Sequence, residues 1–358
     1  MRVAVKRIKR NPEKFEVIDL YTALGRDSNY KLSVEGDVDA FMERIRVSLQ
    51  GSFDNPILLH GKRVEAMFAH VAGALGRCRL IKQEDSGDFY SDETDIQAPD
   101  YSLVTKDGRR LFVEVKNCNH NNIRSPFTIS REYFAKLEAY SALQGADLKI
   151  AIFFSRFQTW VLLSKESFQE QRKKYAITFP NALARNEMSL LGDRMIGTTP
   201  SLEVQLLADP NKEAAINDEG VARFIIGGLR FFCEGRELSS DMDRQIAFYL
   251  MRYGKWCESA AEAILDGEKL AGVRFEYEPE APSEGQNFQM IGTLSTMVSA
   301  AYCEHTIYQE NVVALDVNVD PEVFSLVIPE GYKSKDLPLW QFIIEPNPDF
   351  IPNIAPFE

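Results

Sequence analysis

The segment from Pro99 to Asn117, PDYSLVTKDGRRLFVEVKN, constrains the fold more than any other part of this sequence. Apolar residues alternate with other residues along both of its halves, which is typical of β-strands that bury one face. Between the halves, Lys106-Asp107-Gly108 predicts a three-residue loop, a type I turn followed by glycine in the left-handed conformation. The segment is therefore predicted to form a hairpin whose register is fixed by the length of its loop.

This register determines which side chains meet across the two strands. With a three-residue loop, Asp100 lies opposite Glu114, and Lys116 projects from the same face of its strand as Glu114. A two-residue loop would place Asp100 on the other face. The apolar pairs on the buried face are then Tyr101 with Val113 and Leu103 with Leu111. The predicted hairpin therefore gathers two carboxylates and a lysine.

Two carboxylates held close together repel each other unless a cation lies between them. Carboxylate oxygens suit a hard divalent ion such as Mg²⁺. A lysine beside that ion can orient or deprotonate a water molecule, or offset the charge that develops on a phosphate. Asp100, Glu114 and Lys116 together therefore predict a site for a hard divalent ion, with a lysine beside it that can act on water or phosphate.

The same residues carry a resemblance to a known superfamily. Asp100 followed by Glu114-Val115-Lys116 resembles the PD-(D/E)XK signature of the restriction-endonuclease-like nucleases. Pro99 before Asp100 matches the first letter of that signature. The resemblance implies an α/β fold, specifically a restriction-endonuclease-like α/β/α sandwich with a mixed sheet.

The elements around the hairpin extend the resemblance from Leu58 to Leu163, less than a third of the chain. The spacing of apolar residues predicts a helix from Gly61 to Leu75, and Glu65 on it corresponds to the glutamate that the superfamily carries before its hairpin. A second helix is predicted from Ser130 to Gln144, followed by two strands. This order is similar to that of the archaeal Holliday-junction resolvases.

The resemblance also implies roles for individual residues. Asp100 and Glu114 would hold Mg²⁺, for which Mn²⁺ would substitute, with help from the backbone carbonyl of Val115. Lys116 would orient the attacking water. Glu65 would bind a second ion or a metal-bound water, so the expected catalytic set is Glu65, Asp100, Glu114 and Lys116. The implied activity is that of a metal-dependent endodeoxyribonuclease.

Charge is distributed unevenly along the chain, which suggests parts with different partners. Residues 1–170 contain 25 basic and 24 acidic residues, whereas residues 171–358 contain 16 and 29. We expect a basic N-terminal extension over 1–50, a nuclease domain over 51–168 and an acidic α+β domain over 169–358. The extension is predicted to hold a strand containing Val3, Val5 and Ile8 and a helix around Val38–Leu49.

The acidic region shows no functional motif, but the spacing of its apolar residues predicts a mixture of strands and helices. The predicted helices are Asp241–Leu265 and Met290–Tyr302, and the predicted strands are Tyr175–Thr178, Leu202–Leu207, Ala222–Phe232, Val273–Tyr277, Val312–Val317, Phe324–Ile328 and Trp340–Ile344.

Several classes of protein do not fit the sequence. It has no apolar run of the length that a membrane helix needs, and its basic start lacks the apolar stretch of a signal peptide. Its five cysteines lie far apart without a paired motif, which disfavours a disulfide framework and a zinc site. These features predict a cytoplasmic protein that does not contact a membrane.

The residues and the resemblance leave three functions open. The first is a Mg²⁺-dependent DNA endonuclease in restriction or in defence against foreign DNA. Because its catalytic part is nearly neutral, targeting would come from a homodimer or from a protein partner of the acidic domain. The second is a structure-selective junction or flap nuclease, or one that cuts RNA, acting in repair. The third is a non-catalytic interaction protein that uses the nuclease fold as a scaffold.

Overall fold

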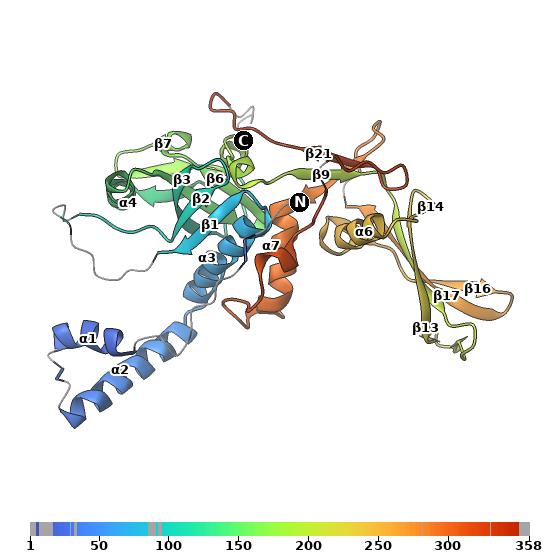
Figure 1. Cartoon of the computed structure of the whole chain (residues 1–358), viewed down its shortest axis with the longest axis horizontal. Helices are drawn as coiled ribbons and strands as arrows, with labels where there is room; N and C mark the ends of the chain where they lie inside the picture. Colours follow the sequence, from blue (N-terminus) through green and yellow to red (C-terminus); the bar gives the residue numbers. More distant parts are fainter. Residues whose placement is uncertain are drawn as a thin grey trace.

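A five-stranded mixed sheet organises the part of the chain that contains the predicted hairpin. The computed structural model describes residues 5–6, 17–28, 30–31, 34–84, 91, 95–280, 282–329 and 331–350. The strand order is β1-β2-β3-β5-β6, in which β3 and β5 are parallel and the other neighbours are antiparallel (Figure 1). These strands are β1 (Cys78–Gln83), β2 (Tyr101–Thr105), β3 (Arg110–Cys118), β5 (Asp147–Phe154) and β6 (Thr159–Leu163).

The hairpin of β2 and β3 has the predicted register. Tyr101 pairs with Val113 and Leu103 with Leu111. Gly108 has a φ of 90°, and its amide donates to the Thr105 carbonyl at 3.0 Å, which closes the three-residue loop. Both the loop length and the left-handed glycine are therefore confirmed.

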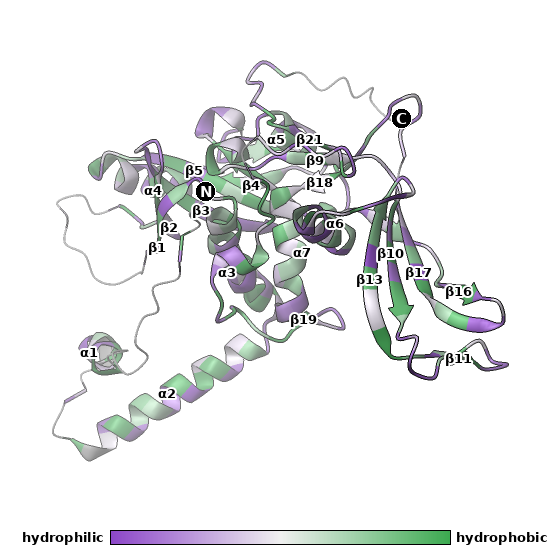
Figure 2. Ribbon diagram, turned by 45° about the vertical axis from the view of Figure 1, so that its right-hand side comes forward, coloured by the Kyte–Doolittle hydropathy of each residue, from purple (hydrophilic) through white to green (hydrophobic). Residues whose placement is uncertain are grey.

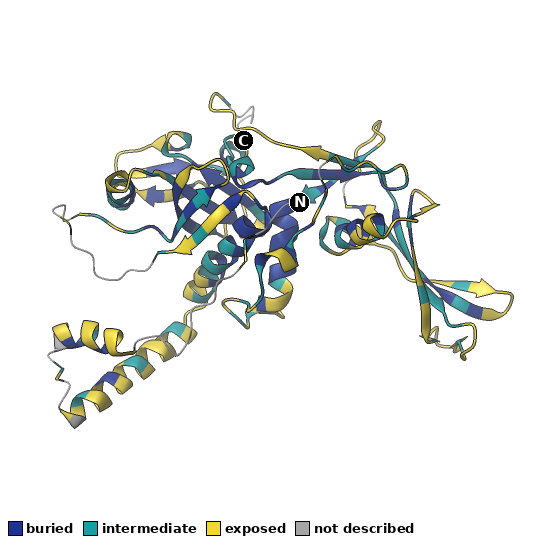
Figure 3. Cartoon of the chain, viewed as in Figure 1, coloured by how far each residue is buried: buried dark blue, intermediate teal, exposed yellow. Residues whose placement is uncertain are grey.

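Two helices cover opposite faces of the sheet. Helix α3 (Pro56–Ala74) begins at Asn55, whose side chain accepts the Leu58 amide, and it buries Met67 and Phe68 against β2 and β3. Helix α4 (Arg131–Leu143) begins at Ser130, whose hydroxyl accepts the Tyr133 amide at 3.1 Å. It packs on the other face, over β5. The alternation of strand side chains thus fills two cores, one on each side of the sheet. Figure 3 shows much of this sheet in the colour of buried residues.

Two further helices precede this unit. Helix α1 (Val17–Ser28) lies against α2 (Glu35–Phe53), with the rings of Tyr21 and Phe41 5.2 Å apart. The predicted helix around Val38–Leu49 is confirmed and is longer than expected. Of the predicted N-terminal strand, Val5 and Lys6 are described and are not in a strand, while its other residues lie outside the described residues. Among the described helices, none is both long enough and apolar enough to cross a membrane.

The remainder of the chain adds several small sheets. A six-stranded sheet contains β10, β13, β14, β15, β16 and β17 and projects away from the mixed sheet (Figure 1). The remaining elements are β4 (Phe127–Ser130), β7 (Gln169–Glu170), β8 (Lys174–Ile177), α5 (Phe179–Ala184), β9 (Met195–Thr198), β10 (Leu202–Ala208), β11 (Ala215–Ile216), β12 (Ala222–Arg223), β13 (Ile226–Cys233), β14 (Arg236–Glu237), α6 (Asp241–Tyr253), β15 (Trp256–Glu258), β16 (Glu262–Asp266), β17 (Lys269–Pro279), β18 (Gln289–Thr293), α7 (Leu294–Thr306), β19 (Ile307–Tyr308), β20 (Asn311–Val312) and β21 (Leu339–Phe342).

The long helix predicted over Asp241–Leu265 is wrong in its second half. Helix α6 ends at Tyr253, because Gly254 adopts an extended conformation and the Trp256 indole donates to the Leu250 carbonyl at 2.6 Å. The chain then enters β15 and β16. A tight turn at Gly267, with a φ of 64°, returns it into β17. The sequence Asp266-Gly267 is a turn signal that outweighs the helical spacing of the apolar residues.

Two other predicted strands are shorter or absent in the structure. The strand expected over Val312–Val317 is limited to β20. The strand expected over Phe324–Ile328 is absent, because Phe324 ends a short 3₁₀ turn, Pro321–Phe324, and residues 325–328 form no regular structure. Proline at the start of this turn lacks an amide for a ladder and favours the turn. The strands expected near residues 175, 202, 222, 273 and 340 are present, with altered ends or interruptions.

Helix α7 connects the C-terminal half to the mixed sheet. The Trp160 indole on β6 donates to the Ser299 hydroxyl on α7 at 2.9 Å, and both side chains are buried. Strand β8, which follows residue 168, pairs with β4, which precedes it, so this pairing is a second contact between the two parts of the chain. The predicted domain boundary after residue 168 stays a prediction. Residues from both sides of this boundary belong to one apolar core.

A buried carboxylate fixes the start of α7. Asp193 accepts the Ser295 amide at 2.9 Å and the Ser295 hydroxyl at 2.6 Å. Burial raises the pKa of Asp193 to about 6, although these hydrogen bonds favour its charged form. The folded state therefore retains a proton on Asp193 at pH values at which the unfolded chain has lost it.

We expect this proton to make stability depend on pH. Since the folded pKa lies about 2 units above the unfolded value, the free energy of unfolding should fall by about 2 kcal/mol as the pH rises from 4 to 7. Asp193→Asn should remove that contribution. The measurement is urea unfolding of wild type and variant across this range. The free energy of unfolding of the wild type minus that of Asp193→Asn should decrease as the pH rises, and a difference that stays constant or increases would contradict the expectation. The control is Asp241→Asn, at an exposed position.

Candidate active site

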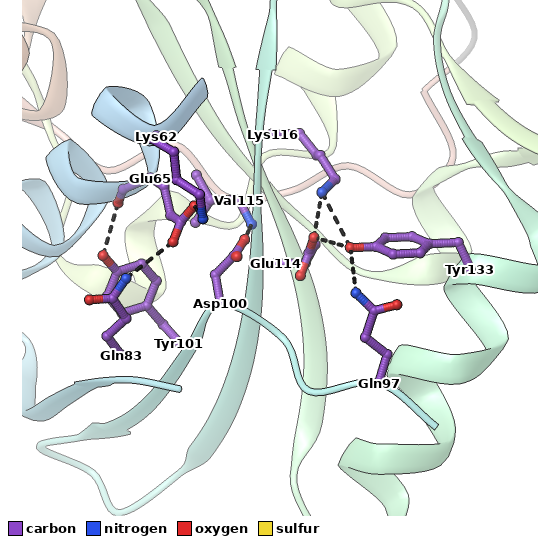
Figure 4. A network of polar contacts seen from close by, with 10 residues as sticks. All are labelled: Lys62, Glu65, Gln83, Gln97, Asp100, Tyr101, Glu114, Val115, Lys116 and Tyr133. Carbon is purple, nitrogen blue, oxygen red and sulfur yellow. Dashed lines mark hydrogen bonds and ion pairs between the residues drawn. The ribbon is translucent and has the colours of Figure 1, made fainter. Parts of the chain in front are cut away.

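Asp100 is fixed against the centre of β3 by a single backbone hydrogen bond. It directly precedes β2, and its Oδ2 accepts the amide of Val115 at 2.7 Å (Figure 4). Its own carbonyl accepts the Glu84 amide at 2.9 Å, which continues the pairing of β1 with β2. The hairpin register and these two bonds place the Asp100 carboxylate beside Glu114 and Lys116.

Glu114 is a buried carboxylate with two strong donors. It is 2% exposed, and its Oε1 accepts from the Lys116 ammonium and from the Tyr133 hydroxyl. The Lys116 Nζ also lies 3.4 Å from the Tyr133 oxygen and 5.1 Å from the centre of its ring. A buried carboxylate is stable only with such partners, so Lys116 and Tyr133 hold Glu114 in one orientation.

Negative charge is concentrated around Asp100. Burial and the charge of Glu114 raise the pKa of Asp100 to about 7, and Glu65 adds to the effect. The Val115 amide and the Lys116 ammonium oppose this shift without cancelling it. A group in this position is stabilised either by taking up a proton or by a neighbouring cation.

Glu65 reaches the site from α3, on the other side of Asp100 from Glu114 (Figure 4). Its Oε2 lies 2.7 Å from the Lys62 ammonium, and its Oε1 accepts the Gln83 amide at 3.1 Å. The Tyr101 hydroxyl donates to the Glu65 backbone carbonyl at 3.0 Å, which ties this turn of α3 to β2. Both Glu65 carboxylate oxygens are thus engaged by protein donors.

The structure therefore brings Glu65, Asp100, Glu114 and Lys116 into one region between α3 and α4. Within the described ranges, no three Asp, Glu, His or Cys side chains converge as a group that could hold a metal ion. The donor set that fits a hard cation consists of two carboxylates, Asp100 and Glu114, and the backbone carbonyl of Val115, which directly follows Glu114 in sequence. The excess negative charge at Asp100 supports this fit.

Tyr133 is a site residue that the sequence reasoning missed. It lies in the first turn of α4, from which its hydroxyl bridges Glu114 and Lys116 and accepts the Gln97 amide at 3.4 Å. The helix predicted from Ser130 places Tyr133 in its first turn, but no local sequence signal brings that turn to Glu114, because the contact depends on how α4 packs on the sheet. Burial raises the pKa of Tyr133, so its hydroxyl remains a donor.

Comparisons with known proteins add little to this geometry. No protein-family model and no curated protein matches the chain. A Holliday junction resolvase from an archaeal hyperthermophile, Archaeoglobus fulgidus Hjc, is similar over 29% of this chain and 80% of its own length. The identity is 16% and the TM-score is 0.23. A similarity this low carries no weight for the activity, which has to follow from the side chains of the site.

The charge at Asp100 predicts that divalent cations stabilise the protein. A Mg²⁺ concentration ten times its dissociation constant should raise the free energy of unfolding by about 1.4 kcal/mol. Asp100→Asn should abolish the increase while its amide oxygen still accepts the Val115 amide. The measurement is thermal unfolding with and without Mg²⁺. An equal increase in Asp100→Asn would contradict the assignment, and the exposed Glu262→Gln variant is the control.

Proposed function

We propose that this protein is a metal-dependent phosphodiesterase that cuts DNA internally, built on a restriction-endonuclease-like arrangement of α3, the mixed sheet and α4. One observation carries the proposal. A buried Glu114–Lys116 pair lies beside Asp100, and the Val115 amide holds the aspartate in place. A solvated pair of surface charges would need neither the burial nor the bridging tyrosine.

In this proposal, Asp100, Glu114 and the Val115 carbonyl hold Mg²⁺, and Mn²⁺ substitutes for it. Glu65 binds a second ion or a metal-bound water. When bound, the ion supplies Lewis-acid polarisation of the phosphate and lowers the pKa of a coordinated water. The oxygen-only donor set matches the preference of Mg²⁺ and Mn²⁺ for hard ligands.

The protein's own residues prepare the reaction. Lys116 is anchored by Glu114 and Tyr133, yet its side chain is 32% exposed, so the ammonium can also contact a water or a phosphate oxygen. Its charge would offset the charge that develops on the phosphate. Tyr133 positions the ammonium, because its hydroxyl fixes Glu114 and its ring lies against Nζ.

The charge distribution supports an enzyme that depends on a partner or on a second subunit to reach its substrate. The first 170 residues are nearly neutral, with 25 basic and 24 acidic residues, so their own affinity for phosphates is modest. We infer that a homodimer or a protein partner directs the site to its substrate, in restriction or in defence against foreign DNA. Parallel assays with plasmid, branched DNA and RNA test this choice of substrate.

The first expected outcome concerns cleavage. Purified protein with Mg²⁺ or Mn²⁺ should cut DNA, and EDTA should stop the reaction. Glu114→Gln and Lys116→Met keep the shapes of the side chains and should lower the single-turnover rate at least about a hundredfold. The rate is measured on labelled DNA with enzyme in excess.

The controls for this assay are charged residues far from the site. Glu262→Gln and Lys269→Met lie on β16 and β17, are exposed, and should leave the rate unchanged. The proposal is wrong if no nucleic acid is cut with either ion, or if cutting persists at the wild-type rate in Glu114→Gln and Lys116→Met.

The second expected outcome concerns Tyr133. Tyr133→Phe keeps the ring against Lys116 but removes the hydroxyl, so the cleavage rate should fall about tenfold while DNA affinity is retained. Tyr140→Phe on the same helix, where the ring packs on Phe112 at 5.3 Å, is the matched control. If Tyr133→Phe weakens DNA binding in proportion to the rate, or changes neither, a positioning role is excluded.

A further inference from the structure

The six-stranded sheet and its hairpins form an arm with a large share of the protein's charge. We define the arm as residues 202–237 and 256–280, which run from β10 to β14 and from β15 to β17. Figures 1 and 2 show that it projects away from the mixed sheet. These residues include 14 Asp and Glu and 6 Lys and Arg, so the arm accounts for −8 of the net charge of −12.

One face of the arm is apolar and incompletely covered. The pairing of β13, β10 and β17 places Phe231, Val204 and Phe275 side by side on this face, with Leu206 beside Leu229. Together with Phe248 of α6, they line an open groove of about 650 Å³. Leu229 is 53% and Phe248 54% exposed, so the mouth of the groove presents large apolar side chains to solvent. Apolar surface of this kind marks a docking site.

Three of the four arginines of the arm form ion pairs within it, and a net negative charge remains for a partner. Arg230 pairs with Glu237, Arg236 with Glu234, and Arg274 with Glu262. Arg244 at the groove donates to the Leu238 and Ser239 carbonyls. Glu258, also at the groove, accepts the Tyr277 hydroxyl at 3.1 Å, and no cation of the described part of the chain pairs with it.

The negative charge of the arm favours some ligands for the groove and disfavours others. A nucleic acid or an anionic lipid surface would be repelled by the arm, and a second copy would bring another −8 against it. A segment that combines apolar side chains with lysine or arginine would fill the groove and meet the acidic surroundings with opposite charge. We propose that the groove on the arm docks a basic, amphipathic segment of a partner protein. The inference is independent of the nuclease activity.

The test uses defined peptides and the full-length protein. The probe is a fluorescent 14-residue amphipathic peptide of leucine and lysine, and its matched control replaces each lysine with glutamate. We expect the basic peptide to bind at least tenfold more tightly, measured by fluorescence anisotropy, and its affinity to fall as salt increases.

Variants of the protein separate docking in the groove from general attraction to an acidic surface. The double variant Leu229→Ser, Phe248→Ser leaves every charge in place and should weaken binding about tenfold. Leu265→Ser, which removes an equally exposed leucine from β16, should have no effect. Because all three side chains are more than half exposed, the variants should fold normally, as circular dichroism can verify.

Three results would overturn the proposal. The first is equal binding of the two peptides, and the second is unchanged binding in the double variant. The third is self-association of the wild type that the double variant abolishes in sedimentation experiments, because the groove would then hold a second copy. A photo-crosslinker at position 229 in cells gives an independent check, since its adduct should be a basic peptide of another protein and not of this chain.

Discussion

The hydrogen bond from the Val115 amide to the Asp100 carboxylate connects the fold to the site. Without it, the residue before β2 would have no fixed relation to the Glu-Val-Lys sequence on β3. The bond depends in turn on the hairpin register, which a three-residue loop and the left-handed Gly108 impose. A change of one residue in the loop would move Asp100 to the opposite face of the sheet.

The hairpin could be predicted because residues close together in the sequence determine its turn and its register. Alternating side chains and turn residues gave the register, and the register placed Asp100, Glu114 and Lys116 together. Contacts between distant segments were not predictable in this way: Tyr133 meets Glu114 only because α4 packs over β5, and α7 reaches Trp160 across more than a hundred residues. Residues 254–265 were predicted to be helical because their apolar spacing masked the break at Gly254, after which the chain forms strands and turns back at Gly267.

The two halves of the chain use their acidic residues differently. In the first half, Glu65, Asp100 and Glu114 lie in one region between α3 and α4, where each carboxylate has a donor and the excess negative charge at Asp100 favours a cation. In the arm, the acids lie mostly on the surface, and one of them, Glu258, lines the apolar groove. The net charge of −12 is therefore compatible with a phosphate-cleaving site, because most of it belongs to the arm, away from α3 and α4.

The central claim is that Asp100 and Glu114 share a divalent cation. Diffraction from crystals soaked in Mn²⁺, recorded at a wavelength at which manganese scatters anomalously, tests it most directly. The account predicts an anomalous peak in contact with the Asp100 and Glu114 carboxylates and the Val115 carbonyl, and no such peak in Asp100→Asn. A saturating soak with manganese bound elsewhere and no peak between these two carboxylates would contradict it.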